Sequence, residues 1–90
     1  MKAKAILEAA GYDVQLAPNP SKWSLQNDLW GLWDLCAVDA ESIRFVQIKT
    51  NARETLIDRE KMSLWPCPSW CRKEVWVFYD RKKDPIIHKL

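Results

Sequence analysis

The sequence has few of the residues on which several common functional sites depend. Its two glycines, Gly11 and Gly31, lie too far apart for a glycine-rich phosphate-binding loop. His88 is the only histidine, and it falls in an edge-strand pattern near the end of the sequence, so we assign it a structural role. No apolar run approaches the roughly 18 residues that span a bilayer, so we expect no membrane association.

The charge and the length narrow the function further. The formal net charge is only +2, so nucleic-acid binding would depend on local basic patches. A chain of 90 residues makes one domain, which we expect to span residues 1–90. A domain of this size buries only about 60–65% of its unfolded surface, so a partner subunit would help to stabilise it.

The three cysteines, in a sequence without a signal peptide, predict a reducing, cytoplasmic compartment. Cys67, Cys71, Cys36 and His88 together make four potential zinc ligands. They lack the tight paired spacing of structural zinc sites, and Cys36 falls in a strand pattern that explains it by packing. We therefore expect no structural zinc, and buried or loop thiols instead.

The apolar pattern predicts an α/β (α+β) fold in the order helix, three strands, helix, two strands. Gly11 fits the C′ position of the first helix, and Asn51 with Glu54 resembles the capping box of the second. We expect Leu56 and Ile57 to make the main apolar contacts of that second helix. The predicted helices cover residues 2–10 and 52–62, and the predicted strands cover residues 12–17, 33–38, 43–49, 74–79 and 86–90.

Six tryptophans are unusual for this length. Trp33 and Trp76 lie inside strand patterns, so we expect them to pack in the core. For the tryptophans in general, the alternative to packing is base stacking or a ligand groove. Trp23, Trp65 and Trp70 lie in loop-like stretches and are better candidates for an interface.

Asp34 is the one acid in the apolar predicted strand 33–38, and two polar residues, Gln47 and Lys49, lie at the end of the predicted strand 43–49. A hairpin that turns between residues 40 and 41 places Asp34 directly opposite Gln47, and Lys49 shares that face because side chains alternate along a strand. A carboxylate, an amide and an ammonium would then meet at one end of the hairpin, as in a divalent-metal phosphodiesterase. The same turn pairs Val38 with Ile43 and Cys36 with Phe45.

These residues resemble the PD-(D/E)XK nuclease superfamily, whose core is commonly helix, three strands, helix, strand. The acid-plus-apolar segment 34–38 is similar to that of archaeal Holliday-junction resolvases, and small viral and phage nucleases of the VRR-NUC type look similar too. The family's usual acid before x-Lys is Gln47 here, as in Mrr-type restriction enzymes. The resemblance implies a restriction-endonuclease-like mixed sheet flanked by helices, in the order αβββαββ, in a bacterial, archaeal or phage-encoded protein.

The resemblance also implies an activity, a divalent-metal-dependent hydrolysis of phosphodiester bonds in duplex or branched DNA, such as Holliday junctions. Asp34, the side-chain oxygen of Gln47 and the backbone carbonyl of Ile48 would bind Mg²⁺ or Mn²⁺. Lys49 would orient the attacking water or stabilise the developing charge on the phosphate.

Several further residues are candidates from their position in the sequence. Glu8 and Asp28 could each supply an accessory acid, because many family members carry a glutamate on the first helix. Lys22, Arg53 and Arg59 could contact flanking phosphates. A homodimer with two sites related by a two-fold axis would suit a duplex or branched substrate.

Two other functions stay open. Gln47 and the missing acid on the first helix favour a non-catalytic nucleic-acid-binding or assembly module that retains the nuclease fold. A tryptophan-rich protein-interaction domain with an unrelated α/β fold would be favoured if Asp34 and Gln47 pointed to opposite faces. Each residue alone also has a structural explanation: Asp34 as a cap, Gln47 as a core amide and Lys49 as a snorkelling lysine.

Overall fold

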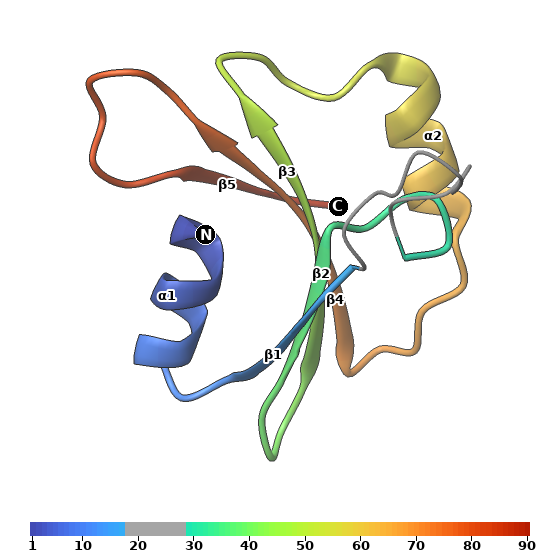
Figure 1. The fold of residues 1–90 in the computed structure, drawn as a ribbon. Helices are drawn as coiled ribbons and strands as arrows, with labels where there is room; N and C mark the ends of the chain where they lie inside the picture. Colours follow the sequence, from blue (N-terminus) through green and yellow to red (C-terminus); the bar gives the residue numbers. More distant parts are fainter. Residues whose placement is uncertain (18–28) are drawn as a thin grey trace, which may run out of the picture.

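A computed structural model describes residues 1–17 and 29–90 of the chain. The described elements follow the predicted order of helix, three strands, helix, two strands, which confirms an α+β class (Figure 1). They are α1 (Lys2–Ala9), β1 (Asp13–Leu16), β2 (Leu35–Val38), β3 (Ile43–Thr50), α2 (Leu56–Leu64), β4 (Cys71–Phe78) and β5 (Ile86–Lys89).

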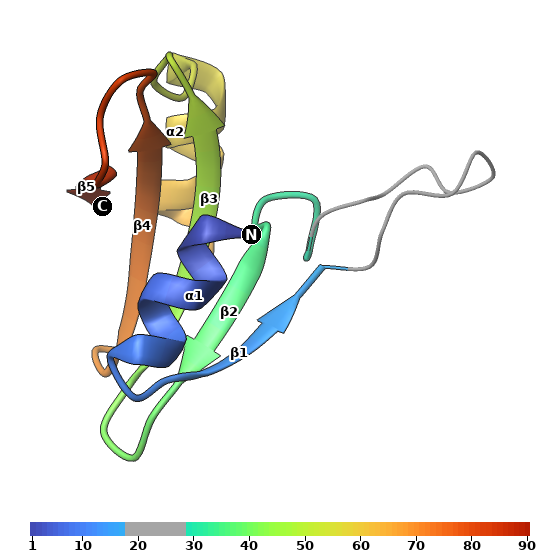
Figure 2. The ribbon, with the colours of Figure 1, turned by 60° about the vertical axis from the view of Figure 1, so that its left-hand side comes forward.

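The strands of the described residues form one mixed sheet in the order β1-β2-β3-β4-β5. β3 and β4 run parallel, and the other neighbouring pairs run antiparallel. Parallel neighbours need a crossover connection, and α2 supplies it. Figures 1 and 2 show α1 and α2 on opposite faces of the sheet, so the two helices cover different sides.

The core consists of two apolar clusters, one on each face of the sheet. Successive residues of a strand point to opposite faces, so Val46 of β3 faces α1 while its neighbour Phe45 faces α2. The central strands are therefore covered on both sides. The buried residues on the α1 face are Ala3, Leu7, Leu35, Ala37, Val46 and Trp76, and those on the α2 face are Trp33, Phe45, Met62, Val75 and Val77.

The tryptophans divide between core and surface. Trp33 and Trp76 are almost completely buried, which confirms the prediction that they pack in the core. Trp65 is half-buried and Trp70 is 59% exposed. Trp23 lies outside the described residues.

The second helix starts later than the sequence predicted. The side-chain oxygen of Thr55 accepts a hydrogen bond from the Asp58 amide at 3.1 Å, so Thr55 is the N-cap and the prediction of Asn51 is wrong. Asn51 has a positive φ of 58° and exchanges two hydrogen bonds with Asp80, at 3.0 and 2.9 Å. It closes the ends of β3 and β4 instead of starting a helix.

The apolar face of α2 is also not the predicted one. Leu56 and Ile57 are 83% and 68% exposed, and Met62 is the residue of α2 that is buried. Each residue of a helix turns by about 100°, so Leu56 and Ile57 lie about 120° and 140° around the helix from Met62, and burial of Met62 leaves them facing solvent. Leu64 is exposed as well, so α2 presents apolar side chains outward.

A buried ion pair lies on the α1 face of the sheet. Glu74 is completely buried, and its Oε1 accepts hydrogen bonds from Arg44 Nε, Arg44 Nη2 and Trp76 Nε1 at 3.0, 2.6 and 2.9 Å. The Arg44 guanidinium also lies over the rings of Tyr12 and Trp76. Burial alone would lower the pKa of Arg44, but the hydrogen bonds and negative charge of Glu74 outweigh it and raise that pKa.

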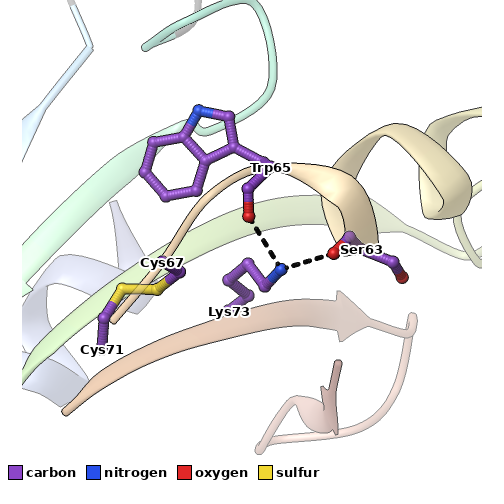
Figure 3. The surroundings of a disulfide bond; sticks show 5 residues. All are labelled: Ser63, Trp65, Cys67, Cys71 and Lys73. Atoms are coloured by element: carbon purple, nitrogen blue, oxygen red, sulfur yellow. Dashed lines mark hydrogen bonds between the residues drawn. A yellow bond between two sulfur atoms is a disulfide. The ribbon is translucent and has the colours of Figure 1, made fainter. Parts of the chain in front are cut away.

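A disulfide joins Cys67 and Cys71 between α2 and β4, so the expectation of unpaired thiols at these positions is wrong (Figure 3). Their Cα atoms lie 5.8 Å apart, within the ordinary range for a disulfide. Lys73 Nζ donates to the carbonyls of Ser63 and Trp65 at 2.9 and 3.1 Å. The chain between α2 and β4 is therefore held at two places.

Neither described helix is long and apolar enough to cross a membrane.

Candidate metal centre

A β-bulge fixes Asp34 at the start of β2. Leu35 is the strand partner of Val46, and the Asp34 amide also donates to the Val46 carbonyl at 2.9 Å, so two residues of one strand oppose one of the other. The Asp34 carbonyl accepts from the Ala17 amide at 2.9 Å. The backbone of Asp34 is thus held by both neighbouring chain segments.

The carboxylate of Asp34 lies against β3. Its Oδ2 accepts a hydrogen bond from the Ile48 amide at 2.6 Å, where a regular ladder would place a backbone carbonyl. The predicted pairs Val38–Ile43 and Cys36–Phe45 are confirmed. The direct opposition of Asp34 and Gln47 is wrong, because the bulge shifts Asp34 by one residue, but the carboxylate still reaches the peptide that joins Gln47 to Ile48.

Gln47 is the most unusual member of the site. It is 9% exposed, and its Oε1 is buried without a hydrogen-bond donor in the part of the chain that the structure describes. A buried amide oxygen without a partner is costly, so such an atom commonly marks a missing water or ion. The sequence pattern could not show that this oxygen lacks a donor.

Lys49 follows Gln47 on the same face of β3, because side chains two residues apart share a face. It is half-buried near the end of the strand. Ile48 lies between them with its side chain on the other face, against the α1 cluster, while its amide binds Asp34. The structure therefore places Gln47 and Lys49 on one face of β3, and the Asp34 carboxylate binds the backbone of Ile48 between them.

The oxygen atoms of Asp34 and Gln47 are of the type that a hard divalent cation prefers, but they are too few to complete its coordination. Mg²⁺ is usually held by one or two carboxylates, and water and substrate phosphates supply the remaining oxygens. Asp34 offers the carboxylate and Gln47 the neutral oxygen. Over residues 1–17 and 29–90, no three His, Cys, Asp or Glu side chains gather in a metal-binding group.

The other predicted residues lie elsewhere. Glu8 is exposed on α1, across the sheet from Gln47, so the structure does not bring this candidate acid to the site. Arg53 is exposed in the connection after β3 and forms an ion pair with Glu54 at 2.7 Å, and Arg59 is exposed on α2. Asp28 and Lys22 lie outside the described residues.

Glu54 is a charged residue in the connection between β3 and α2, and the sequence pattern predicted it in a helix capping box. Its burial alone would raise its pKa, but hydrogen bonds from Arg53 and from its own backbone amide lower it, and the pKa lies below the usual value. Glu54 therefore carries a negative charge at neutral pH. That charge is paired with Arg53, which leaves Arg53 a weaker candidate for a phosphate contact.

An aromatic cluster lies on the same face as Gln47. Phe45 precedes Gln47 by two residues on β3, and its ring centroid lies 4.7 Å from that of Trp65 and 6.0 Å from that of Trp33. Trp30 completes the cluster, 5.8 Å from Phe45 and 5.2 Å from Trp65. The sequence pattern gives no sign of this role for Trp30 beyond the adjacent Gly31.

Comparisons with protein-family models, with curated proteins and with solved structures found no match for this chain.

Proposed function

We propose that this protein is a divalent-metal-dependent endonuclease that hydrolyses phosphodiester bonds of DNA. The observation that carries the proposal is the Oε1 atom of Gln47, a buried oxygen that has no donor among the described residues. Gln47 directly precedes Ile48, whose amide binds the carboxylate of Asp34. A bound cation would satisfy that oxygen and would use the negative charge of the carboxylate.

The arrangement of the elements supports the same proposal. The order helix, three strands, helix, strand is the order that the resemblance to the PD-(D/E)XK superfamily implies. Asp34 lies just before β2, and the Gln47-x-Lys49 triplet lies near the end of the neighbouring β3. Both positions agree with those that the resemblance assigns to the acid and to the x-Lys motif.

The residues would divide the chemistry between them. Bound Mg²⁺ or Mn²⁺ would polarise the scissile phosphate and lower the pKa of an attacking water. Asp34 and Gln47 would hold the ion through their side-chain oxygens, with the Ile48 carbonyl as a third donor. Lys49 would place its positive charge where negative charge develops on the phosphate.

Cleavage assays test the proposal. Supercoiled plasmid and a four-way junction are incubated with Mg²⁺ or Mn²⁺ and the wild-type protein, and cleavage is followed on gels. Asp34→Asn and Lys49→Met are each expected to lower the cleavage rate at least about 100-fold, the usual effect of removing one charge-stabilising group. Asp13→Asn is the matched control, since Asp13 is exposed on β1. Cleavage that survives both site variants would contradict the assignment.

A non-catalytic DNA-binding module is the second candidate. It is favoured by the neutral Gln47 at the position of the family's usual acid, and by Glu8, which lies across the sheet from the site. Salt-sensitive binding of the plasmid or the junction without cleavage in either metal would select this function. Absence of both binding and cleavage would favour a protein-interaction domain.

A further inference from the structure

Trp30 occupies a backbone position that a bulky residue rarely adopts. The Leu32 amide donates to the Leu29 carbonyl at 3.0 Å, and the two central residues, Trp30 and Gly31, have φ values of 52° and 69°. Positive φ at both central positions is the geometry of a type I′ turn, where Asn and Gly are preferred. A tryptophan there strains the backbone, and such strain occurs preferentially at functional sites.

The Trp30 indole at this turn is exposed to solvent. The side chain is 65% exposed, although indole is among the largest apolar groups that a protein can bury. Its ring meets Trp65 at 55° and Phe45 at 76°, and these tilted and edge contacts leave most of the ring uncovered. We call this exposed ring and its two supporting rings the Trp30 platform.

Two residues support Trp30: Trp65, whose backbone is held by Lys73, and Phe45, which belongs to a central strand. The carbonyl of Trp65 accepts from Lys73 Nζ at 3.1 Å, and the Cys67–Cys71 disulfide closes the chain that follows (Figure 3). Phe45 belongs to the central strand β3 and is 7% exposed. A ring that already packs against neighbouring rings loses less side-chain entropy when it binds a ligand than a ring without such contacts.

We propose that Trp30 is a stacking site for an unpaired nucleobase, so that the substrate carries a single-stranded segment beside the scissile phosphate. The inference rests on the proposed nuclease function. Phe45 supports Trp30 from below and precedes Gln47 on the same face, so the platform lies about 7 Å along β3 from the candidate metal site. Lys49 continues that face beyond Gln47 and supplies a positive charge for the same strand.

A nucleobase fits this surface better than a protein partner does. The other described rings of the cluster are buried or half-buried, so one indole is the apolar area offered there. A specific protein interface needs about 800 Å² from each partner, whereas one base is covered by one ring. Stacking on an aromatic ring accepts any base, so the site needs no further sequence-reading contacts.

The test measures binding without cleavage. The full chain in EDTA is titrated into a fluorescein-labelled 12-nucleotide single strand and into the same sequence as a blunt duplex, and anisotropy gives the two Kd values. Trp30→Ala is expected to weaken single-strand binding between about 5-fold and about 140-fold, the range set by one lost base–aromatic stack. Trp30→Phe is expected to retain most of the affinity, and duplex binding is expected to be unchanged.

The matched control is Trp70→Ala. Trp70 is 59% exposed, comparable to Trp30, but it lines the shallow groove at the β2–β3 turn beside Val38 and Ile43. It is expected to leave single-strand binding unchanged. An equal loss in the two alanine variants, or a loss that is equal for single strand and duplex, would overturn the stacking site.

Three further outcomes separate the alternatives. If wild-type protein self-associates and Trp30→Ala abolishes only that association, the ring is a protein contact and the proposal is wrong. If Trp30→Ala selectively weakens single-strand binding while neither metal supports cleavage by the wild type, the nuclease function fails and the stacking site stands. If Trp30→Ala changes neither the cleavage of duplex plasmid nor single-strand binding, the nuclease function stands and the stacking site is wrong.

Discussion

At the scale of single residues, two buried oxygens lack hydrogen-bond donors in the described part of the chain: Gln47 Oε1 and Glu74 Oε2. They differ in what surrounds them. The other carboxylate oxygen of Glu74 accepts three hydrogen bonds from Arg44 and Trp76, so Glu74 already has its charge compensated. The side-chain oxygen of Gln47 accepts no hydrogen bond from the described residues, and Ile48, the next residue, binds the Asp34 carboxylate through its amide. This difference is why we place the proposed metal site at Gln47 and give Glu74 a structural role.

Replacing Gln47 by an acid is expected to strengthen metal binding. Gln47→Glu adds a negative charge at the proposed metal site, and we expect the Kd for Mn²⁺ to fall by about tenfold, equivalent to about 1.4 kcal/mol. Isothermal titration calorimetry measures the change. Gln15→Glu, on the exposed side of β1, is the control for added charge alone. An equal effect of the two substitutions would contradict a site at Gln47.

Removing Arg44 is expected to destabilise the fold strongly. Arg44→Met leaves the completely buried Glu74 carboxylate unpaired, and breaking such a pair costs about 3–5 kcal/mol. Urea unfolding monitored by tryptophan fluorescence measures the loss. Arg72→Met is the control, because Arg72 is the exposed strand partner of Arg44 on β4. The double variant Arg44→Met, Glu74→Met is expected to be more stable than Arg44→Met alone, and the opposite result would contradict the ion-pair explanation.

At the scale of elements, short polar contacts and backbone conformation decide where strands turn and where helices begin and end. Asp39 Oδ1 accepts hydrogen bonds from the amides of Glu41 and Ser42 at 2.9 and 2.8 Å, which sets the turn between β2 and β3. Thr55 caps α2, and Gly11 ends α1 with a φ of 94°. The turn at Asp39 matters most for the site, because it fixes the register that brings Asp34 to Ile48.

The turn is expected to make stability depend on acidity. The backbone hydrogen bonds from Glu41 and Ser42 lower the pKa of Asp39 below its usual value of about 3.9. A lowered pKa means that the stabilisation is complete above that usual value and is lost as the pH falls through the lowered pKa. The difference in Tm between wild type and Asp39→Ala should therefore shrink from pH 7 to pH 2.

Asp39→Asn provides the control for this effect, because its amide keeps the acceptor oxygen but has no charge to lose. Its Tm difference from Asp39→Ala should change little over the same pH range, as measured by circular dichroism. A wild-type advantage that persists undiminished at pH 2 would contradict the role of the ionised carboxylate.

At the scale of the whole molecule, the small size and the exposed face of α2 point to a partner. Leu56, Ile57 and Leu64 are 83%, 68% and 76% exposed, and Met62 is the buried residue of this helix. The homodimer expected from the sequence stays a prediction, and this apolar face is where we place the contact with a second copy.

Sedimentation velocity tests the dimer. The wild type is expected to sediment at twice the protomer mass of 10.6 kDa, and Ile57→Lys is expected to sediment as a monomer, because a charge replaces apolar contact area. Ile86→Lys, at a 42% exposed position on β5, should leave the dimer intact. A monomeric wild type would contradict the dimer, and a dimeric Ile57→Lys would contradict the assigned face.

The sequence predicted the elements and the strand register well where the hydrophobic periodicity was strong. It predicted them less well where contacts between segments far apart in the chain determine the structure. The apolar pattern along 43–49 predicted β3, and the turn between residues 40 and 41 predicted the pairing of Val38 with Ile43. The bulge at Asp34 was missed, because it depends on how the chain enters the sheet next to Ala17 and Val46. The predicted start of α2 was too early, because Asn51 binds Asp80 in the turn after β4, and helix propensity carries no information about that contact.

For this protein, the order of the elements, the hairpin register and the three polar residues of the candidate site followed from the sequence alone, because hydrophobic periodicity and turn chemistry act over a few residues. The tertiary structure decided which polar atoms are left without partners, which tryptophans are exposed and which cysteines are joined. Burial and pairing depend on side chains that meet from strands and loops far apart in the chain. Hence Asp34 and Gln47 could be named from their spacing, but the orphan oxygen of Gln47 and the exposed ring of Trp30 required the folded arrangement.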